Sequence, residues 1–333
     1  MPDGGRTGLR LAVVIPAWNE SSDLGRTIAS IPRHFQGISE VRIIVVDDGS
    51  TDGTAEAATS AGADRIIVHS KHRGLARAWS TGIAAALRDG AQVIAHTDAD
   101  GQYVSEDIAR LLEPLLAGDA DMVVGSRPIG EIGHFSRSKR ALQLLGSRVV
   151  SLAAGVPLPD APSGFRAMTA QAARALNVHG TYTYTLETLI QAGRTGLAVT
   201  SVPVRVAGPT RPSRLVRSTP SYVWHSMTTI VRIAVLYRPF RFFAFMGVVL
   251  LAVSAGFGIA GVGSGGSGGR MELGPHFFAA AVLAVAGVQA FLTAFLADAM
   301  AANRRLSERL LAASSREGLP EDAATAAAKG DCR

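Results

Sequence analysis

Short apolar runs that each end in a polar cluster are the feature that most restricts the fold of this 333-residue chain. Residues 11–15, 41–46 and 91–96 are such runs, and continuous apolar character is typical of parallel strands buried on both faces. Helical stretches separate them. Strands that alternate with helices indicate an α/β fold, with a mostly parallel sheet and helices on both faces.

Three polar clusters follow these runs, at residues 16–20, 47–52 and 98–102. Ligands of such sheets bind beyond the carboxyl ends of the strands, where the three clusters are expected to meet. Asp98 and Asp100 are two residues apart on an extended segment, so their side chains point the same way. Two carboxylates there can hold Mg²⁺ or Mn²⁺, which shares its coordination with substrate phosphates. An isolated Asp-x-Asp pair also occurs in simple turns, so the convergence of the clusters carries the interpretation.

For several residues of the clusters, a structural role is the alternative to ligand binding. Asp48, Ser50 and Asp52 are common turn formers and helix caps, and capping explains them as well as ligand binding does. Asp47 is nearest to the strand end, where its carboxylate can accept hydrogen bonds from a ribose or a base. We expect Pro16 to end the first strand.

Further polar residues allow two interpretations in the same way. Asn19 and Glu20 can cap a helix, although they fall at the same sheet edge. Ser105 is expected to cap the helix that follows the Asp-x-Asp pair. Residues 160–166 are expected to form a turn into another helix. Glu187, in an otherwise uncharged helical stretch, is more often a satisfied helix residue than a catalytic one.

Composition divides the chain into four parts. Residues 1–208 contain the strands and helices of the catalytic domain. Residues 209–239 mix arginines with aromatic and aliphatic side chains, which is typical of an amphipathic helix at a membrane surface; a basic helix docked on the core is the alternative. Residues 240–300 are mostly apolar. Residues 301–333 are expected to be a disordered cytoplasmic tail.

Two apolar runs, about 242–262 and 273–296, are each longer than the roughly 18 residues that mark a membrane-spanning helix. Arginines flank the outer ends of the pair. The positive-inside rule therefore predicts an integral protein of the cytoplasmic membrane, with the catalytic domain and both termini in the cytoplasm. The glycine-rich stretch 261–266 matches a dinucleotide-binding pattern, but it follows a membrane span rather than a strand and is expected to be a loop.

Charge and cysteine content limit the partners. The net charge of +6 predicts anionic partners. Nucleic acid is excluded because the basic residues cluster beside the apolar runs. The single cysteine, Cys332, excludes intrachain disulfides and fits a reducing compartment.

Four motifs in order resemble those of the family 2 glycosyltransferases, which have the GT-A fold. They are AVVIPAWNE at 12–20, IVVDDGSTDGT at 44–54, TDADGQ at 97–102 and SGFR at 163–166. The two C-terminal apolar runs narrow the resemblance to the polyprenyl-phosphate glycosyltransferases, relatives of dolichol-phosphate mannose synthase. The resemblance covers roughly residues 11–296.

The resemblance implies an inverting transferase that moves a hexose, mannose or glucose, to polyprenyl phosphate at the cytoplasmic membrane face. The donor would be a nucleotide-sugar such as GDP-mannose or UDP-glucose, and the cofactor Mg²⁺ or Mn²⁺. Membrane lipid is a further partner. The oligomeric state is left open, a homo-oligomer included.

The resemblance also implies roles for individual residues. Those that would bind the nucleotide-sugar are Pro16, Asn19, Glu20, Asp47, Asp98, Arg211 and Ser213. Those that would hold the metal are Asp98, Asp100 and Gln102. Those that would meet the lipid phosphate are Arg127, Arg137, Lys139 and Arg140. The expected catalytic residues are Asp100, Asp160 and Arg127.

One position departs from the family pattern. Some relatives place a carboxylate directly before the Phe-Arg pair as a base, but this chain has Gly164 there and its nearest carboxylate is Asp160. Asp160 is therefore the candidate for positioning the acceptor phosphate. Two other functions stay open: a membrane-anchored transferase with a glycan or protein acceptor, and a non-catalytic nucleotide-binding membrane partner. The basic segment argues against the first, and the intact Asp98 and Asp100 against the second.

Overall fold

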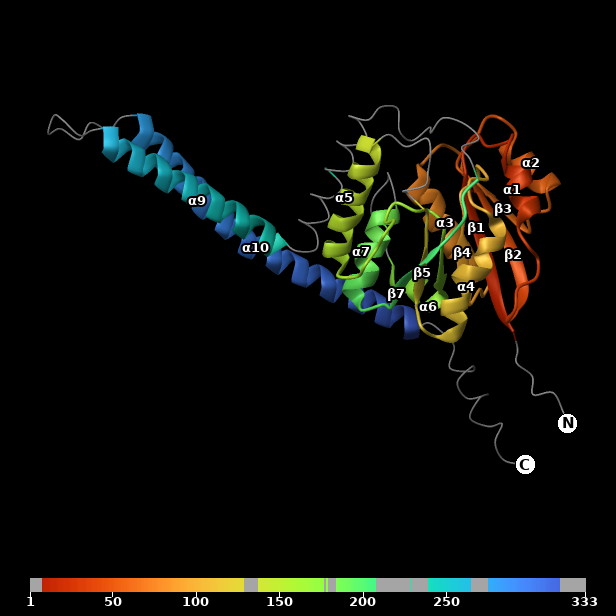
Figure 1. Cartoon of the computed structure of the whole chain (residues 1–333). Coiled ribbons are helices and arrows are strands. Elements are labelled where there is room, and N and C mark those ends of the chain that lie inside the picture. Colours follow the sequence, from red (N-terminus) through yellow and green to blue (C-terminus); the bar gives the residue numbers. More distant parts are fainter. Residues whose placement is uncertain are drawn as a thin grey trace. The chain divides into compact units, whose positions relative to one another are not determined.

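The computed structural model describes residues 8–128, 137–176, 178, 184–207, 228, 239–264 and 275–317, without the side chains of 137–139, 141, 142, 263, 264 and 304–317. The chain forms two compact units, Met1–Ser226 and Met227–Arg333 (Figure 1). The predicted boundaries at 208 and 209 lie outside the described residues.

The first unit is built on a sheet that, within the described residues, has seven strands in the order β3-β2-β1-β4-β6-β5-β7. The strands are β1 (Leu9–Ala17), β2 (Ile38–Asp47), β3 (Arg65–Val68), β4 (Val93–His96), β5 (Met122–Ser126), β6 (Arg166–Thr169) and β7 (Val199–Pro203). All pairs are parallel except those that β6 makes with β4 and β5. The predicted α/β fold with a mostly parallel sheet is confirmed.

Helices cover both faces of this sheet (Figure 1). They are α1 (Leu24–Ser30), α2 (Thr54–Ser60), α3 (Leu75–Arg88), the 3₁₀ turn η1 (Ser105–Asp107), α4 (Ile108–Ala117), α5 (Arg137–Ala154), α6 (Ala170–Ala175) and α7 (Thr185–Thr195). The alternation of β1 separates the two faces, because Val13 packs into the cluster under α1 and α4 whereas Val14 faces α3. Buried apolar side chains therefore line both sides of β1.

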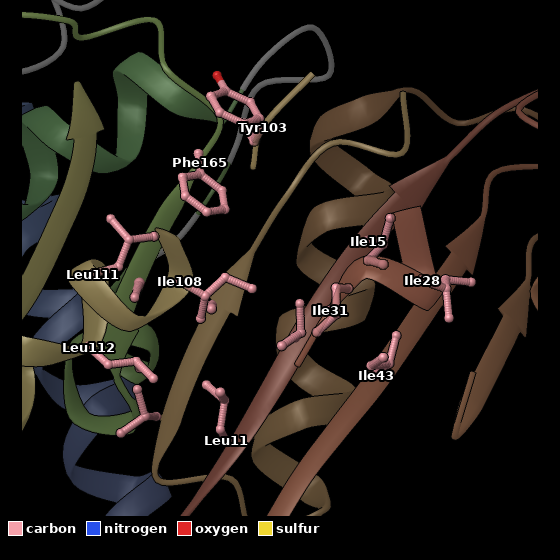
Figure 2. Packing of buried hydrophobic residues seen from close by; sticks show 14 of the residues in the cluster. Leu11, Ile15, Ile28, Ile31, Ile43, Tyr103, Ile108, Leu111, Leu112 and Phe165 are labelled. Atoms are coloured by element: carbon pink, nitrogen blue, oxygen red, sulfur yellow. The ribbon is translucent and has the colours of Figure 1, made fainter. Parts of the chain in front are cut away.

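A core cluster of buried residues joins β1, β2, α1 and α4, and Figure 2 shows its aliphatic side chains between these elements. At the end nearest the strand termini, Tyr103 stacks on Phe165 with ring centroids 4.8 Å apart. Figure 2 shows the Tyr103 hydroxyl pointing away from the leucines of α4. The core thus ends in an aromatic pair whose polar tip faces the polar clusters.

Three local predictions were wrong. Pro16 lies inside β1, opposite Val46; β1 pairs with β4 only up to Val14, so the ladder on that side has ended before the proline. Residues 160–166 do form a turn, but Arg166 opens the strand β6 rather than a helix, because its neighbours β4 and β5 supply ladder partners on both sides. Ser105 caps no helix, since its hydroxyl lies 2.8 Å from that of Ser30.

The second unit is a pair of antiparallel helices, α9 (Pro239–Ser264) and α10 (Pro275–Glu317). Pro239–Val262 and Pro275–Asn303 are long and apolar enough to cross a membrane, as predicted from the two runs. The helices pack closely where glycines face each other: a Cβ on Gly287 would lie 2.7 Å from Leu251 Cγ and 3.2 Å from the Gly247 carbonyl oxygen.

Helix α10 continues past residue 300 to Glu317, so the prediction of a disordered tail was wrong for residues 301–317. Alanine, leucine, arginine and glutamate dominate residues 301–317, and these residues favour helix. Residues 318–333 and the linker 265–274 lie outside the described residues.

We predict that Gly82→Ala destabilises the catalytic unit by about 1–3 kcal/mol, the usual effect of overfilling a core. A Cβ at residue 82 would lie 2.3 Å from Val14 Cγ1, so α3 would have to move away from the sheet. Thermal unfolding of the full chain in detergent, followed by tryptophan fluorescence, measures the change.

The matched control is Gly146→Ala in α5, where a Cβ meets nothing within 4 Å. That change should stabilise the protein by about 0.4–1 kcal/mol, because it only reduces the freedom of the unfolded chain. Equal stability of the two variants would contradict the close contact between α3 and β1.

Candidate active site

The loops after β1 and β2 are joined by side-chain to backbone hydrogen bonds. Asn19 has a φ of 54°, a left-handed conformation that asparagine tolerates better than most residues. In this conformation its Oδ1 accepts from the Thr51 N–H at 2.9 Å, and its own N–H donates to Ser50 Oγ at 2.8 Å. The Glu20 N–H donates to Thr54 Oγ1. Two of the predicted polar clusters therefore form one connected edge.

Asp48 and Asp52 have the structural roles that the sequence left open. The buried Asp48 carboxylate accepts hydrogen bonds from the Arg73 and Gly74 N–H groups, at the start of α3, and lies 2.6 Å from His69 Nδ1. Asp52 Oδ1 accepts from the Thr54 N–H at the start of α2, and its other oxygen accepts from Ser21. Both carboxylates thus hold loops and helix starts in place.

Asp47 lies at the last position of β2, as predicted, and its side chain is buried. Its Oδ1 accepts from the Ser50 N–H at 2.9 Å. Nearby, the rings of Trp18 and His72 stack with centroids 4.2 Å apart, and Trp18 remains 40% exposed. Sequence reasoning missed this aromatic surface, because His72 comes from a loop after β3 whose position only the fold determines.

Asp98 and Asp100 follow β4 and share one environment. Burial and the charge of Asp100 raise the pKa of Asp98 to about 7, while the nearby Arg127 opposes the shift. Two carboxylates that repel each other in a partly buried place favour a bound cation. Within the described residues no group of three or more His, Cys, Asp or Glu side chains could hold a metal. These two carboxylates therefore fit an ion that takes its remaining ligands from a substrate diphosphate or water.

Helix α1 fixes the backbone of the Asp-x-Asp loop. The buried Thr27 hydroxyl donates to the Ala99 carbonyl at 3.0 Å, between the two carboxylates. The Gln102 N–H donates to Asp100 Oδ1 at 3.1 Å, and the Gln102 carbonyl accepts from the Ala207 N–H. The predicted metal residues therefore lie on one loop that contacts both α1 and the segment after β7.

Gly164 packs directly against Asp98. A Cβ at residue 164 would lie 2.9 Å from Asp98 Oδ1 and 3.0 Å from Oδ2. The Gly164 N–H donates to the Tyr103 hydroxyl, whose pKa is raised to about 12 by burial. A side chain at this position would displace Asp98, which explains physically why this chain has no carboxylate there.

Arg127 and Asp160 form a bidentate ion pair. Arg127 Nε and one terminal nitrogen lie 2.6 and 3.0 Å from the two Asp160 oxygens, and the Arg127 N–H also donates to Asp160. Gln143 of α5 donates a further hydrogen bond at 3.2 Å. The Asp160 side chain is fully buried, whereas 18% of the Arg127 side chain remains exposed. Asp160 therefore orients a guanidinium that can still meet a ligand.

Arg166, the last residue of the SGFR motif, is structural. It is fully buried and donates to the carbonyl oxygens of Ser163, Ala161 and Thr185. Burial lowers its pKa to about 10, so it stays charged at neutral pH. It lies opposite His96 in the β4–β6 register, and burial together with this charge holds the pKa of His96 well below its usual range.

Not every predicted site residue falls within the description. Arg140 lies on α5 with a described side chain, but the side chains of Arg137 and Lys139, and all of Arg211 and Ser213, lie outside it. Glu20, Asp98, Asp100 and Arg127 are brought together, since Glu20, Asp100 and Arg127 all act electrostatically on Asp98. The buried Glu187 lies in the first turn of α7.

A model of the family described as Glycosyl transferase family 2 matches residues 12–176. Over 206 residues the chain is 31% identical to an undecaprenyl-phosphate mannosyltransferase of Micrococcus luteus, an alignment that covers 59% of this chain and 83% of the relative. The chain belongs to glycosyltransferase family 2. It is also 31% identical to a polyprenol monophosphomannose synthase of Mycolicibacterium smegmatis, with 59% of this chain and 76% of the relative covered. The predicted family is confirmed.

Solved structures support the predicted GT-A fold. Glucosyl-3-phosphoglycerate synthase from Mycobacterium tuberculosis, in complex with Mn²⁺, uridine-diphosphate and phosphoglyceric acid, is similar with a TM-score of 0.53 at 21% identity. The alignment covers 68% of this chain and 79% of that one. That structure holds Mn²⁺ together with a nucleoside diphosphate.

We predict that Gly164→Ala weakens Mn²⁺-dependent binding of a nucleoside diphosphate about tenfold, or about 1.4 kcal/mol. The added methyl group would push Asp98 out of position. Titration calorimetry of the full chain with UDP and GDP, with and without Mn²⁺, measures the effect.

Gly25→Ala serves as the control, because a Cβ at that helical position meets only Ala61 at 4.0 Å. It should leave binding unchanged. Unchanged Mn²⁺-dependent binding in Gly164→Ala would mean that Asp98 moves without consequence and is not a metal ligand.

Proposed function

We propose that this glycosyltransferase moves a hexose from a nucleotide-sugar to polyprenyl phosphate at the cytoplasmic membrane face, with inversion of the anomeric carbon. The observation that carries the proposal is Arg127, a guanidinium held by the buried Asp160 within electrostatic reach of Asp98. A fixed cation beside a donor diphosphate site suits an acceptor that is itself an anion. The two 31% identical relatives, whose names specify undecaprenyl phosphate and a polyprenol, support the same acceptor.

The donor would bind at the connected edge formed by the loops after β1, β2 and β4. The proposed contacts are Pro16, Asn19, Glu20, Asp47, Asp98, Arg211 and Ser213. The exposed Trp18 ring, stacked on His72, offers a flat surface of the kind on which a nucleobase stacks. Guanine and uracil both fit this description, so the proposal covers GDP- and UDP-sugars.

Asp98, Asp100 and Gln102 would hold Mg²⁺ or Mn²⁺. When bound, the ion neutralises the negative charge that develops on the leaving diphosphate. The contribution of the chain is to keep the two carboxylates close together: Thr27 holds the backbone between them, and Gly164 leaves room for Asp98.

The acceptor needs no strong base. A phosphate monoester oxygen is already ionised at neutral pH, so it can attack the anomeric carbon while the bond to the diphosphate breaks. Arg127 would hold this phosphate, with Arg137, Lys139 and Arg140 as further contacts. The attack forms one bond as the other breaks on the opposite side of the carbon, which inverts the centre. The enzyme's task is to bring two anions together, and fixed cations serve it.

Asp160 acts in this proposal as a positioning residue rather than as a base. Its oxygens accept three hydrogen bonds from Arg127 and one from Gln143, so its charge is directed at the guanidinium. Arg127 in turn is aimed at the acceptor. The position before Phe165, where some relatives have a base, is Gly164.

We predict that Asp160→Asn raises the KM for the acceptor about tenfold or more, because Arg127 loses its charged partner, a loss that converts to about 1.4 kcal/mol or more. The donor KM and the pH profile of kcat should stay close to those of the unmodified enzyme. Initial rates at varied acceptor, donor and pH distinguish the two roles.

The control is Asp107→Asn, which breaks a similar bidentate pair with Arg205. It should cost stability without changing the acceptor KM. A loss confined to kcat in Asp160→Asn, with the acid limb of its pH profile removed, would instead identify Asp160 as a catalytic base.

The two apolar helices support anchoring in a membrane. Arginines flank the pair at its outer ends, at residues 238, 241, 304 and 305, whereas the linker side offers only Arg270 beside Glu272. By the positive-inside rule both ends of the hairpin, and hence the catalytic unit, are proposed to lie in the cytoplasm.

We predict that the purified full chain in detergent transfers label from one nucleotide-sugar to undecaprenyl or decaprenyl phosphate in the presence of Mg²⁺. GDP-mannose, UDP-glucose and other labelled GDP- and UDP-sugars form the donor panel. Asp100→Ala should reduce transfer about 100-fold or more, since one of two carboxylates that would hold the ion is lost.

Label in the lipid with one donor would establish the reaction and identify the sugar. Nucleotide binding without lipid product, whichever donor is supplied, would contradict the proposal. It would favour a glycan or protein acceptor, or a non-catalytic membrane partner.

A further inference from the structure

Helix α5 directs two polar side chains toward the catalytic unit, next to the buried Val150 and Ala154. The side that packs on the catalytic unit contains the buried Gln143 and Ser147. Gln143 donates to Asp160, and Ser147 Oγ accepts from the Ala161 N–H. A surface helix of a soluble domain normally directs its apolar residues inward and its polar residues to water.

The opposite side of α5 exposes leucines. Leu144, Leu145 and Leu152 are 55%, 60% and 72% exposed, and Arg148 lies between them at helical spacing. These four residues are here called the α5 leucine face. Elsewhere in the described part of the catalytic unit, the large exposed apolar side chains are isolated on separate elements, at Trp18, Val68 and Leu116. The leucine face is therefore a concentrated apolar surface that the described part of the catalytic unit does not cover.

We propose that the α5 leucine face lies in the membrane interface, with its leucines at the boundary between lipid headgroups and acyl chains. The inference rests on the proposed function and extends it to the place where the enzyme meets its acceptor. The face belongs to a chain with two helices long enough to cross a membrane, so a bilayer is always within reach of the tethered catalytic unit. Leucines with an arginine among them are typical of a helix that lies in the plane of an interface.

The α5 leucine face lies on the same helix as a residue that supports the proposed acceptor site. Gln143, on the other side of the same helix, bonds to Asp160, which orients Arg127. The leucines and the contact to Asp160 thus lie on opposite sides of the same helix. With the leucines in the interface, Arg127 is positioned near the depth of lipid phosphates, where a polyprenyl phosphate presents its headgroup.

The shape and charge of the face favour a bilayer over other occupants. Its leucines are each more than half exposed, whereas a single prenyl chain would be enclosed by a groove. A second copy packed through the same face would bring the two Arg148 side chains together in an apolar contact, which is costly for like charges. In an interface, Arg148 instead meets lipid phosphates.

The test measures depth in the bilayer. In a Cys332→Ser background, which removes the chain's one cysteine, Leu144→Cys and Leu152→Cys are labelled with a small fluorophore in proteoliposomes that contain brominated lipid. Thr59→Cys on the exposed side of α2 is the matched control. We expect quenching at 144 and 152 at least threefold stronger than at 59. Equal quenching at all three positions would overturn the proposal, as would cross-linking between copies through 144 or 152 in place of quenching.

A second arm connects the contact to activity. Leu152→Glu should lower transfer to a long polyprenyl phosphate in proteoliposomes about tenfold, but leave transfer to a short, water-soluble prenyl phosphate in detergent unchanged. Leu116→Glu, an exposed leucine on α4, should behave as the unmodified enzyme. Equal rates of Leu152→Glu and the unmodified enzyme with both acceptors would overturn the proposal. Quenching does not depend on turnover, so absence of all transfer together with strong quenching would contradict the proposed function alone.

Discussion

The antiparallel insertion of β6 between β4 and β5 is the constraint on which the site depends. A purely parallel sheet would bring only strand ends to this edge, whereas β6 begins there and carries the preceding turn with it. That turn brings Gly164 against Asp98 and supplies two of the carbonyl partners of Arg166, those of Ala161 and Ser163, while Thr185 of α7 supplies the third. The strand itself is four residues long, so its position depends on its two neighbours rather than on its own propensity.

The charged side chains of the site have different roles, some structural and some suited to a ligand. Asp48 and Asp52 accept hydrogen bonds from backbone N–H groups and hold loops, whereas the charge of Asp100 helps to raise the pKa of Asp98. Arg127 is paired with Asp160, but part of the Arg127 side chain remains exposed and can meet a ligand. The result is an anionic position suited to a metal next to a cationic position suited to a phosphate.

The sequence predicted the fold class, the strand-end clusters and the family, because buried parallel strands and acidic loops leave strong local patterns. It missed what tertiary contacts decide. Pro16 stays in a strand because the neighbouring ladder stops at Val14, and Ser105 bonds to Ser30 rather than capping a helix. Among the site residues, Asp98 and Asp100 follow their strand as predicted, but no local pattern indicates that Gln143 supports Asp160, or that His72 stacks on Trp18. The roles of Arg211 and Ser213 stay predictions.

The close approach of α9 and α10 at Gly247 and Gly287 has a consequence for how this part of the chain can vary. Backbones that touch through glycine leave no space for any side chain, so those two positions admit essentially one residue. The outward positions, such as Ile259 and Val285, are mostly exposed and need only remain apolar. The amino acids on the outer surface of the hairpin can therefore change during evolution, whereas Gly247 and Gly287 must remain glycine.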